Sequence, residues 1–225
     1  MTDRHHISAA FSAELHSLRN QILDMGRLVD THVGEAVRAL TERDPALAAR
    51  VIEADRAVNQ MELAIDEQCI RMLALRQPAA SDLRFIAAAL KMVTDLERIG
   101  DLAVNMAERV EALTAGPPLG AAAALPALAG TTRQMLGDVL DAFVSGDSAK
   151  AEAVMKTDPD VDARSAALIA EVEADMTRDP TTVRRGLATI FFAKHLERLA
   201  DHATNVAEMV VYLVRGRDVR HAQAT

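Results

Sequence analysis

Two stretches of the chain carry oxygen-bearing side chains at helical spacing. Residues 96–110 read LERIGDLAVNMAERV, and residues 196–210 read LERLADHATNVAEMV. On a helix that turns about 100° per residue, the acids and amides of each stretch fall within about 80° of one another. Those side chains are Glu97, Asp101, Asn105 and Glu108 in the first stretch and Glu197, Asp201, Asn205 and Glu208 in the second. Such groups at the rim of a buried helix face can bind a hard or borderline metal cation through oxygen.

The two stretches are copies of one sequence. Nine of their fifteen positions are identical at an offset of 100 residues, and the shared residues are polar as often as apolar. Two unrelated amphipathic helices would agree only in their apolar positions, so we infer an internal duplication. A solvated or salt-bridged helix edge remains the alternative interpretation of the acids.

The composition favours an all-helical protein. Half of the 225 residues are hydrophobic and only 3% are aromatic, so Ala, Leu, Val, Ile and Met must supply the core. The net charge of −8 argues against nucleic-acid binding, which normally needs a basic face. The sequence shows no apolar region of a signal peptide and no uncharged apolar stretch of about 18 residues. We therefore expect a cytoplasmic protein that reaches a membrane only through partners.

Apolar periodicity predicts three long helices in the first half of the chain. The first spans 8–43 and contains Gly26 and Gly34, which we expect at close helix contacts. Asp44 provides an N-cap, with proline at the first helical position, for a second helix that runs to about Arg76.

The acidic stretches then fall on the third and the sixth helix. Ser81 or Asp82 can cap the third helix. In the second half, Gly146 ends a fourth helix, Asp147 caps a fifth and Asp179 opens a sixth.

The duplication extends over the whole chain, which gives the fold class. Residues 55–59 match residues 158–162, and Asp44 and Asp147 both precede a helix. We therefore predict an all-α fold of two tandem, pseudo-symmetric three-helix bundles with six long helices. We assign residues 8–114 to the first repeat, 115–128 to a linker, 129–216 to the second repeat and 217–225 to a C-terminal tail.

Four short motifs stand in an order and spacing known from one protein family. They are LALRQP at 73–78, DLR at 82–84, DLERIGDLAVNMAE at 95–108 and HLERLADHATNVAE at 195–208. With them the sequence resembles the PhoU family of phosphate-transport accessory proteins, from Phe11 to about Gly216. The resemblance implies a fold of two similar three-helix bundles.

The resemblance also implies a function and partners. It implies a negative regulator of the phosphate-starvation (Pho) response and of phosphate uptake. Members of the family are thought to link the ATPase subunit of the phosphate ABC transporter to the sensor histidine kinase. We expect such an adaptor to be a homodimer.

The resemblance implies metal ligands as well. Family members can carry iron, zinc, manganese or magnesium on an E/D-x-x-x-D motif, which here is Glu97 with Asp101 and Glu197 with Asp201. Four further residues are second choices that rest on the helical wheel alone, namely Asn105, Glu108, Asn205 and Glu208. Because Asp95 of the first motif is replaced by His195 in the second, we expect weaker metal binding by the second repeat.

Basic residues flank the acidic stripes. His195 and His202 lie roughly opposite Glu197 on the wheel, so we expect them at the surface or between the bundles. Arg98 lies about 100° from the preceding glutamate, and we expect it to pair with a neighbouring helix, for example with Asp55.

The sequence offers little for catalysis. No glutamate is followed by a histidine three residues later, which disfavours a carboxylate-bridged di-metal oxidase. The chain also lacks a P-loop and a nucleophile elbow. We therefore expect no enzymatic activity and no organic cofactor. A purely structural helical adaptor without bound metal is the alternative to the metal-binding adaptor.

Overall fold

Six long helices make up the part of the chain that the structure describes. This structure, a computed structural model, describes the backbone of residues 2–217 and the side chains of residues 9–217, so the predicted tail lies outside it from residue 218 onward. The helices are α1 (Thr2–Thr41), α2 (Pro45–Arg76), α3 (Ala80–Thr114), α4 (Leu125–Ser145), α5 (Ser148–Arg178) and α6 (Val183–Arg215). Short 3-10 helices, η1 (Ala121–Ala124) and η2 (Pro180–Thr182), precede α4 and α6. The predicted all-α class with a repeated set of three helices is confirmed, whereas the proposed residue boundaries of the repeats stay a prediction.

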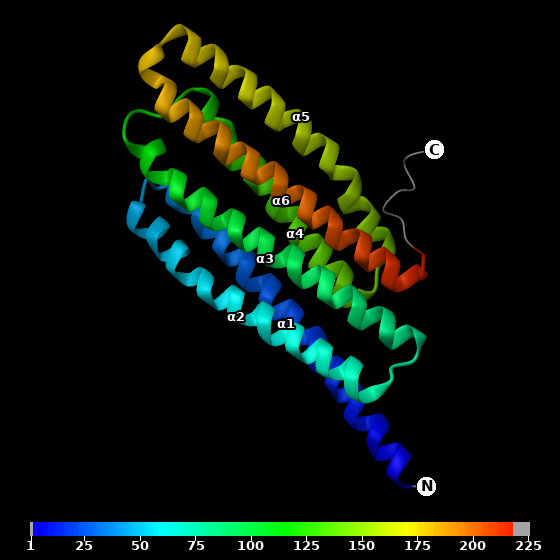
Figure 1. The fold of residues 1–225 in the computed structure, drawn as a ribbon. Coiled ribbons are helices and arrows are strands. Elements are labelled where there is room, and N and C mark those ends of the chain that lie inside the picture. The colour runs from blue at the N-terminus through cyan, green and yellow to red at the C-terminus, as the bar shows by residue number, and fades with distance from the viewer. Residues whose placement is uncertain (1, 218–225) are drawn as a thin grey trace.

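The two sets of helices form bundles that lie side by side (Figure 1). Helices α1, α2 and α3 pack on one another, as do α4, α5 and α6. The two bundles meet chiefly where α3 and α6 run in opposite directions along the middle of the molecule, with α2 and α5 on the outer flanks (Figure 1). The two helices that carry the duplicated acidic stretches are therefore neighbours.

Two cation–π contacts join α3 to α6, one towards each end of the helix pair. The Arg109 guanidinium lies 5.8 Å from the centroid of the Phe191 ring. Towards the other end, the guanidinium of Arg84 lies 5.8 Å from the centroid of the Tyr212 ring. Both are cation–π contacts from an arginine of α3 to an aromatic ring of α6. They fix how the two helices lie along one another.

Two aspartates begin the second helix of each bundle as predicted. The side chains of Asp44 and Asp147 each accept hydrogen bonds from the backbone N–H groups two and three residues later, at 2.9 and 3.0 Å. Gly146, with φ of 66°, provides the left-handed residue that ends α4. The predicted caps are therefore confirmed at these positions.

The predicted cap of α3 is wrong. The helix begins at Ala80, and its N-cap residue Ala79 makes no side-chain capping bond, while Ser81 and Asp82 already lie in the first turn. The chain turns sharply before this point because Gln77 adopts a left-handed conformation with φ of 45°. Asp82 still stabilises the beginning of the helix, because its negative charge is attracted to the positive end of the helix dipole.

Glycines in α1 let α4 approach closely, as their positions predict. A Cβ atom at Gly34 would stand 2.9 Å from Cζ of Arg133, and one at Gly26 would meet the Leu140 side chain. The Arg133 guanidinium passes Gly34 to form two hydrogen bonds of 3.0 Å with the carboxylate of Asp30. Such a bidentate pair fixes direction as well as distance. It therefore ties the two bundles together along α1 and α4.

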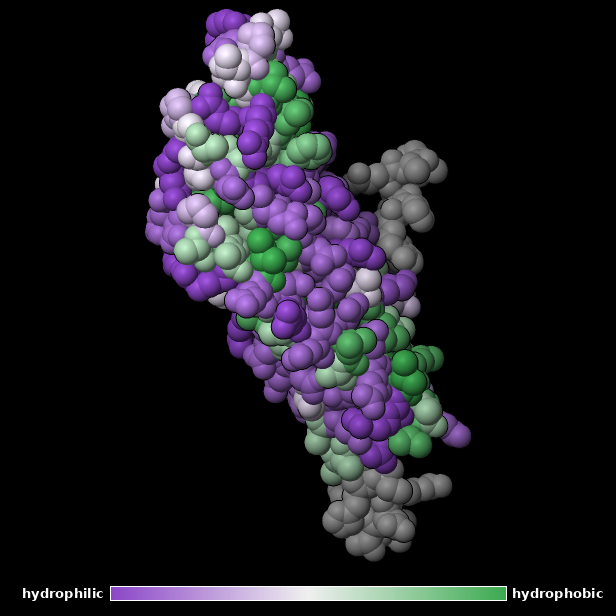
Figure 2. Space-filling view, turned by 60° about the vertical axis from the view of Figure 1, so that its left-hand side comes forward, coloured by the Kyte–Doolittle hydropathy of each residue, from purple (hydrophilic) through white to green (hydrophobic). Residues whose placement is uncertain are grey.

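Aliphatic side chains form one continuous core through both bundles. The largest side chains that are fully buried include Phe192, Leu18, Ile22, Met92 and Leu96. Hydrophilic residues cover most of the face shown in Figure 2, with hydrophobic residues in several separate patches. Within residues 2–217 no helix combines the length and the apolarity that a membrane span requires.

Neighbouring phenylalanines of α6 provide a test of this packing. Phe192 is 0% exposed and Phe191 is 50% exposed. We expect Phe192→Ala to lower the free energy of unfolding by about 3–5 kcal/mol, because it leaves a cavity in the core. Phe191→Ala should cost only on the order of 1 kcal/mol, mainly through the contact with Arg109. Urea unfolding of both variants measures the difference, and equal costs would contradict the assigned burial.

Candidate metal site

The acidic stretch of α3 meets a second acidic helix, α2. Asp55 of α2 lies over Gly100, where an added Cβ atom would stand 3.6 Å from Asp55 Oδ1. The amide of Asn59 donates a 2.9 Å hydrogen bond to the other oxygen, Oδ2. Asp55 Oδ1 itself is buried and accepts no hydrogen bond from the described residues. A buried carboxylate oxygen without a donor is costly, so this oxygen is a candidate ligand for a cation.

Five acids of α2 and α3 form what we call the first acidic cluster: Asp55, Glu62, Asp66, Glu97 and Asp101. Burial raises the pKa of Glu97, and the charges of Asp101 and Glu62 raise it further. Burial likewise raises the pKa of Glu62, with the charge of Asp66 adding to the effect. These carboxylates lie close enough to repel one another, and a bound cation would relieve that repulsion.

A histidine of α1 lies behind the first acidic cluster. His32 is 3% exposed, and its Nδ1 atom has no hydrogen-bond partner among the described residues. Burial lowers the pKa of His32, although the charge of Asp55 opposes this shift. Burial also raises the pKa of Asp55, and the charge of Asp101 adds to that. The neutral form of His32, which burial favours, can donate a nitrogen lone pair to a metal ion.

The second bundle contains a matching set, which we call the second acidic cluster: Asp158 and Asp162 of α5 with Glu197 and Asp201 of α6. Burial raises the pKa of Asp158 to about 6, with the charges of Asp201 and Asp162 adding to the effect and the Thr204 hydroxyl opposing it. Burial also raises the pKa of Asp201. Asp158 Oδ1 is buried without a hydrogen bond of good geometry in the described part, as is Asp55 Oδ1 in the first bundle.

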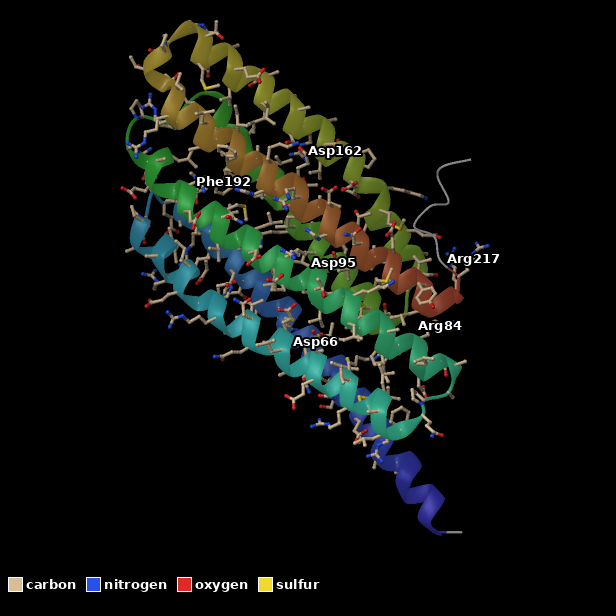
Figure 3. The ribbon with its side chains drawn as sticks, in the orientation of Figure 1. Asp66, Arg84, Asp95, Asp162, Phe192 and Arg217 are labelled. Carbon is tan, nitrogen blue, oxygen red and sulfur yellow. The ribbon has the colours of Figure 1, made fainter. Side chains whose placement is uncertain are left out.

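The two acidic clusters lie on opposite sides of the α3–α6 pair. Figure 3 shows Asp66 on α2 and Asp162 on α5, with Asp95 in the middle between them. Each cluster thus belongs to one bundle and is formed by the second and third helix of that bundle. The predicted pairs, Glu97 with Asp101 and Glu197 with Asp201, therefore belong to two separate candidate sites.

The clusters differ in charge, but not for the reason that the sequence suggested. At the offset of 103 residues that relates α2 to α5, Glu62 and Asp66 correspond to Ser165 and Ile169, whereas Asn59 corresponds to Asp162. Two acids are lost and one is gained, so the second cluster has fewer acids. The replacement of Asp95 by His195 does not change either cluster, because Asp95 faces α6 instead. Weaker metal binding by the second repeat stays a prediction.

Asp95 holds the two bundles together. Its Oδ1 atom lies 2.8 Å from Nδ1 of His202 and accepts a 3.0 Å hydrogen bond from the amide of Asn205. His202 therefore lies between the bundles, as its position on the wheel predicts. Burial, together with the charges of Arg109 and Arg198, lowers the pKa of His195 to about 4.

Three of the second-choice ligands have other surroundings, and Asn105 stays a prediction. Asn205 and Glu208 line a groove against α3 together with Asp95, so they do not face Asp158 across the second cluster. Glu108 is exposed and pairs with Arg109 at 3.1 Å. The wheel placed these residues on the correct helix stripe but could not tell which helix would lie opposite.

Cations on the same helix partly neutralise the acids. Arg98 Nε lies 3.7 Å from Glu97 Oε2, and Arg98 Nη1 lies 3.9 Å from Asp101 Oδ2. The expected pairing of Arg98 with Asp55 is therefore wrong, because the long side chain folds back along its own helix. In the second cluster, Lys194 pairs with Glu197 in the same way.

The donor atoms fit a metal ion, although they do not form a finished site. Carboxylate oxygens suit magnesium, manganese and iron, and an imidazole nitrogen also suits zinc. In the first cluster Asp55, Glu97 and Asp101 would hold the ion. Within the described part of the chain, no three His, Cys, Asp or Glu side chains converge closely enough to form a complete ligand set. Binding therefore requires side chains to turn towards the ion.

The acids of the second helix in each bundle were missed in the sequence. Asp55 and Asn59 in α2, and Asp158 and Asp162 in α5, repeat the one-turn spacing of the α3 motif. This match indicates the duplication, and the same spacing also places candidate ligands on one edge of α2 and of α5. His32 carries no such signal, because its equivalent at the offset of 103 residues is Met135.

Comparisons with known proteins agree on one family. A family model described as the PhoU domain matches residues 22–110 and 125–210. A Pseudomonas putida protein named phosphate-specific transport system accessory protein PhoU homolog is 44% identical over 218 residues, which cover 96% of this chain and 85% of that protein. The phosphate-specific transport system accessory protein PhoU of Escherichia coli K12 is 39% identical over 216 residues, which cover 96% of this chain and 90% of that protein.

Solved structures give the same result. The crystal structure of PhoU from Pseudomonas aeruginosa matches with a TM-score of 0.88 at 43% identity, covering 92% of this chain and 100% of that chain. The phosphate transport system regulatory protein PhoU from Streptococcus pneumoniae matches with a TM-score of 0.86 at 33% identity, covering 93% and 99%. The fold is therefore shared over more than nine-tenths of this chain.

Because the pKa of Asp158 is raised, replacing this aspartate should stabilise the protein in a pH-dependent way. Because the folded pKa of about 6 exceeds the ordinary value of 3.8, folding penalises the ionised form. The penalty is complete above pH 6 and is lost as the pH falls towards 3.8. We expect Asp158→Asn in metal-free protein to raise the free energy of unfolding by on the order of 1–2 kcal/mol at high pH, a value reduced for partial exposure.

Urea unfolding in the presence of a chelator measures this effect at pH 8 and pH 5. The gain should be smaller at pH 5. The control is Asp160→Asn, two residues along the same helix, where the carboxylate is exposed and pairs with Arg164 at 3.5 Å. An equal gain at both pH values would show that ionisation of Asp158 does not destabilise the folded protein.

Proposed function

Since this chain belongs to the PhoU family of phosphate-transport accessory proteins, we propose that it is a negative regulator of the Pho response and of phosphate uptake. In this role it is a cytoplasmic homodimer and a metal-binding helical adaptor. Its partners are the ATPase subunit of the phosphate ABC transporter and the sensor histidine kinase of the phosphate response.

The pair of acidic clusters is the observation that carries the adaptor role. The duplication provides two similar bundles, each with an acidic edge formed by its second and third helix. Two separate edges on one molecule suit contact with two different partners. The names of two relatives support this assignment. One is an accessory protein of phosphate-specific transport, and the other is a phosphate transport system regulatory protein.

A bound metal ion would set the net charge of each acidic cluster. Without metal, the acids of a cluster repel one another, and protonation is the other means of relieving this repulsion. A bound cation supplies charge neutralisation at Asp55, Glu97 and Asp101 and holds α2 against α3. It thereby presents a rigid surface to the partner.

A purely structural adaptor without metal is the alternative. Its support is that Arg98 and Lys194 already lie against the acids and that no complete ligand set is formed. In that case, basic side chains of the partners, rather than a metal ion, would neutralise the acidic clusters.

Metal content distinguishes the two functions. Untagged protein purified without chelator should contain metal, and Glu97→Gln with Asp101→Asn should lose the share bound by the first cluster. The control, Asp24→Asn with Glu111→Gln, removes the same two charges from exposed positions elsewhere and should keep all metal. Wild-type protein that stays metal-free after incubation with iron, zinc, manganese or magnesium would leave the alternative.

Regulation is tested in cells. Deletion of the gene should switch on a Pho-controlled reporter in medium rich in phosphate, and the wild-type gene should restore repression. The Glu97→Gln, Asp101→Asn variant should fail to restore it at equal protein level, while the exposed-site control succeeds. Repression by the cluster variant would show that metal at the first cluster is dispensable, and a reporter that stays off after deletion would contradict the regulatory function.

A further inference from the structure

A cavity lies at the end of the molecule where both repeats meet, away from the acidic clusters. Its volume is about 450 Å³, within the range of cavities that bind small molecules. The ends of α1 and α3, the connection that follows α3, and the beginnings of α4 and α6 contribute to its walls. These segments come together at one end of the bundles (Figure 1).

The walls of the cavity are mainly apolar. They include Leu40, Leu113, Pro118, Leu119, Ala122 and Pro126. No acidic side chain of the described residues lines the cavity, although the chain as a whole has a net charge of −8. Among the described residues, the only charged ones that line the cavity are Arg43 and Arg185.

The two arginines converge on one residue of the connection, Gly116. Nη2 of Arg43 donates hydrogen bonds to the carbonyl oxygens of Thr114, at 2.6 Å, and Gly116, at 2.8 Å. The guanidinium of Arg185 lies against the Cα atom of Gly116, so closely that it occupies the space of a Cβ atom. Arg43 also has a φ of 56°, a conformation that side chains other than glycine rarely adopt. Two like charges are thus held together at the wall of an apolar cavity.

Within the described part of the chain, Arg43 bonds to backbone carbonyl oxygens and neither arginine forms an ion pair with a carboxylate. Nε of Arg185 is buried and makes no hydrogen bond there. The charge of Arg185 contributes to the lowered pKa of Asp179, after the hydrogen bonds from Thr181, but the two residues form no ion pair. Because Nε is enclosed by protein, an anion in the cavity would reach the terminal N–H groups of Arg185 instead. There it would form charge-assisted hydrogen bonds with a cation that has no carboxylate partner.

We propose that this cavity binds a small amphipathic anion. The apolar body of the ligand lies against the aliphatic and proline walls, and its single anionic group lies at Arg43 and Arg185. An apolar body complements the apolar walls, and an anionic group complements the two cations that have no carboxylate partner. Residues from both repeats form the site, which is independent of the acidic clusters and of metal.

The test uses octyl phosphate as the probe, below its micelle concentration, in calorimetric titrations of the full chain. Octyl phosphate should bind to the wild type, and octanol and inorganic phosphate should each bind at least about tenfold more weakly, because each lacks one half of the recognition. Arg185→Gln should weaken octyl phosphate binding by about tenfold or more, through loss of a charge-assisted contact. The matched control is Arg184→Gln, because the neighbouring Arg184 is exposed and does not line the cavity.

Several results would overturn the proposal. They are no binding of octyl phosphate to the wild type, equal binding by Arg185→Gln, and equal binding of inorganic phosphate, which would assign the arginines to free phosphate. Circular dichroism checks that each variant is folded. If Arg185→Gln does not fold, Ala123→Phe, which places a ring at the cavity wall, should block octyl phosphate instead, and unchanged binding by that variant would equally overturn the site.

Discussion

The side-by-side packing of α3 and α6 is the constraint on which the rest of the structure depends. Each of these helices has one face in its own bundle and another against the opposite repeat. The contacts of Arg84 with Tyr212 and of Arg109 with Phe191 fix their antiparallel register. Because α3 and α6 pack against each other in the middle of the molecule, their acidic edges lie on the sides that face α2 and α5. The location of both acidic clusters follows from that single contact.

Within each cluster, packing and electrostatics oppose one another. The aliphatic faces of α2 and α3 bring Asp55 over Gly100, where its Oδ1 atom loses contact with water. The resulting desolvation and the neighbouring charges raise the pKa values of Asp55 and Glu97. An arrangement that costs stability and that recurs in both bundles is typical of binding sites. Arg98 and Lys194 reduce this cost at the surface without removing it.

Local sequence patterns predicted much of the fold and about half of the candidate site. The duplication, the helix-starting Asp44 and the close approach at Gly34 depend on residues near in sequence or on the absence of a side chain, and these were predicted correctly. The partner of Arg98 and the contribution of Asp55 and His32 depend on which helix lies opposite. A helical wheel contains no information on that point, since it describes one helix at a time. The wrong cap at Ser81 and Asp82 has a local cause, because the turn at Gln77 lets the helix begin before either residue.

The contact of Asp95 with His202 shows what joining two copies in one chain makes possible. At the offset of 100 residues, the counterpart of Asp95 is His195 and the counterpart of His202 is Leu102, so this polar contact occurs on one side of the α3–α6 pair only. In a symmetric dimer of single repeats, every interface substitution would occur in both copies. An aspartate that stabilises one half of the interface would then also be present in the other half. Covalent fusion removed that requirement. Each half could then change alone, and two identical first repeats would place a leucine, the counterpart of His202, where Asp95 finds its partner.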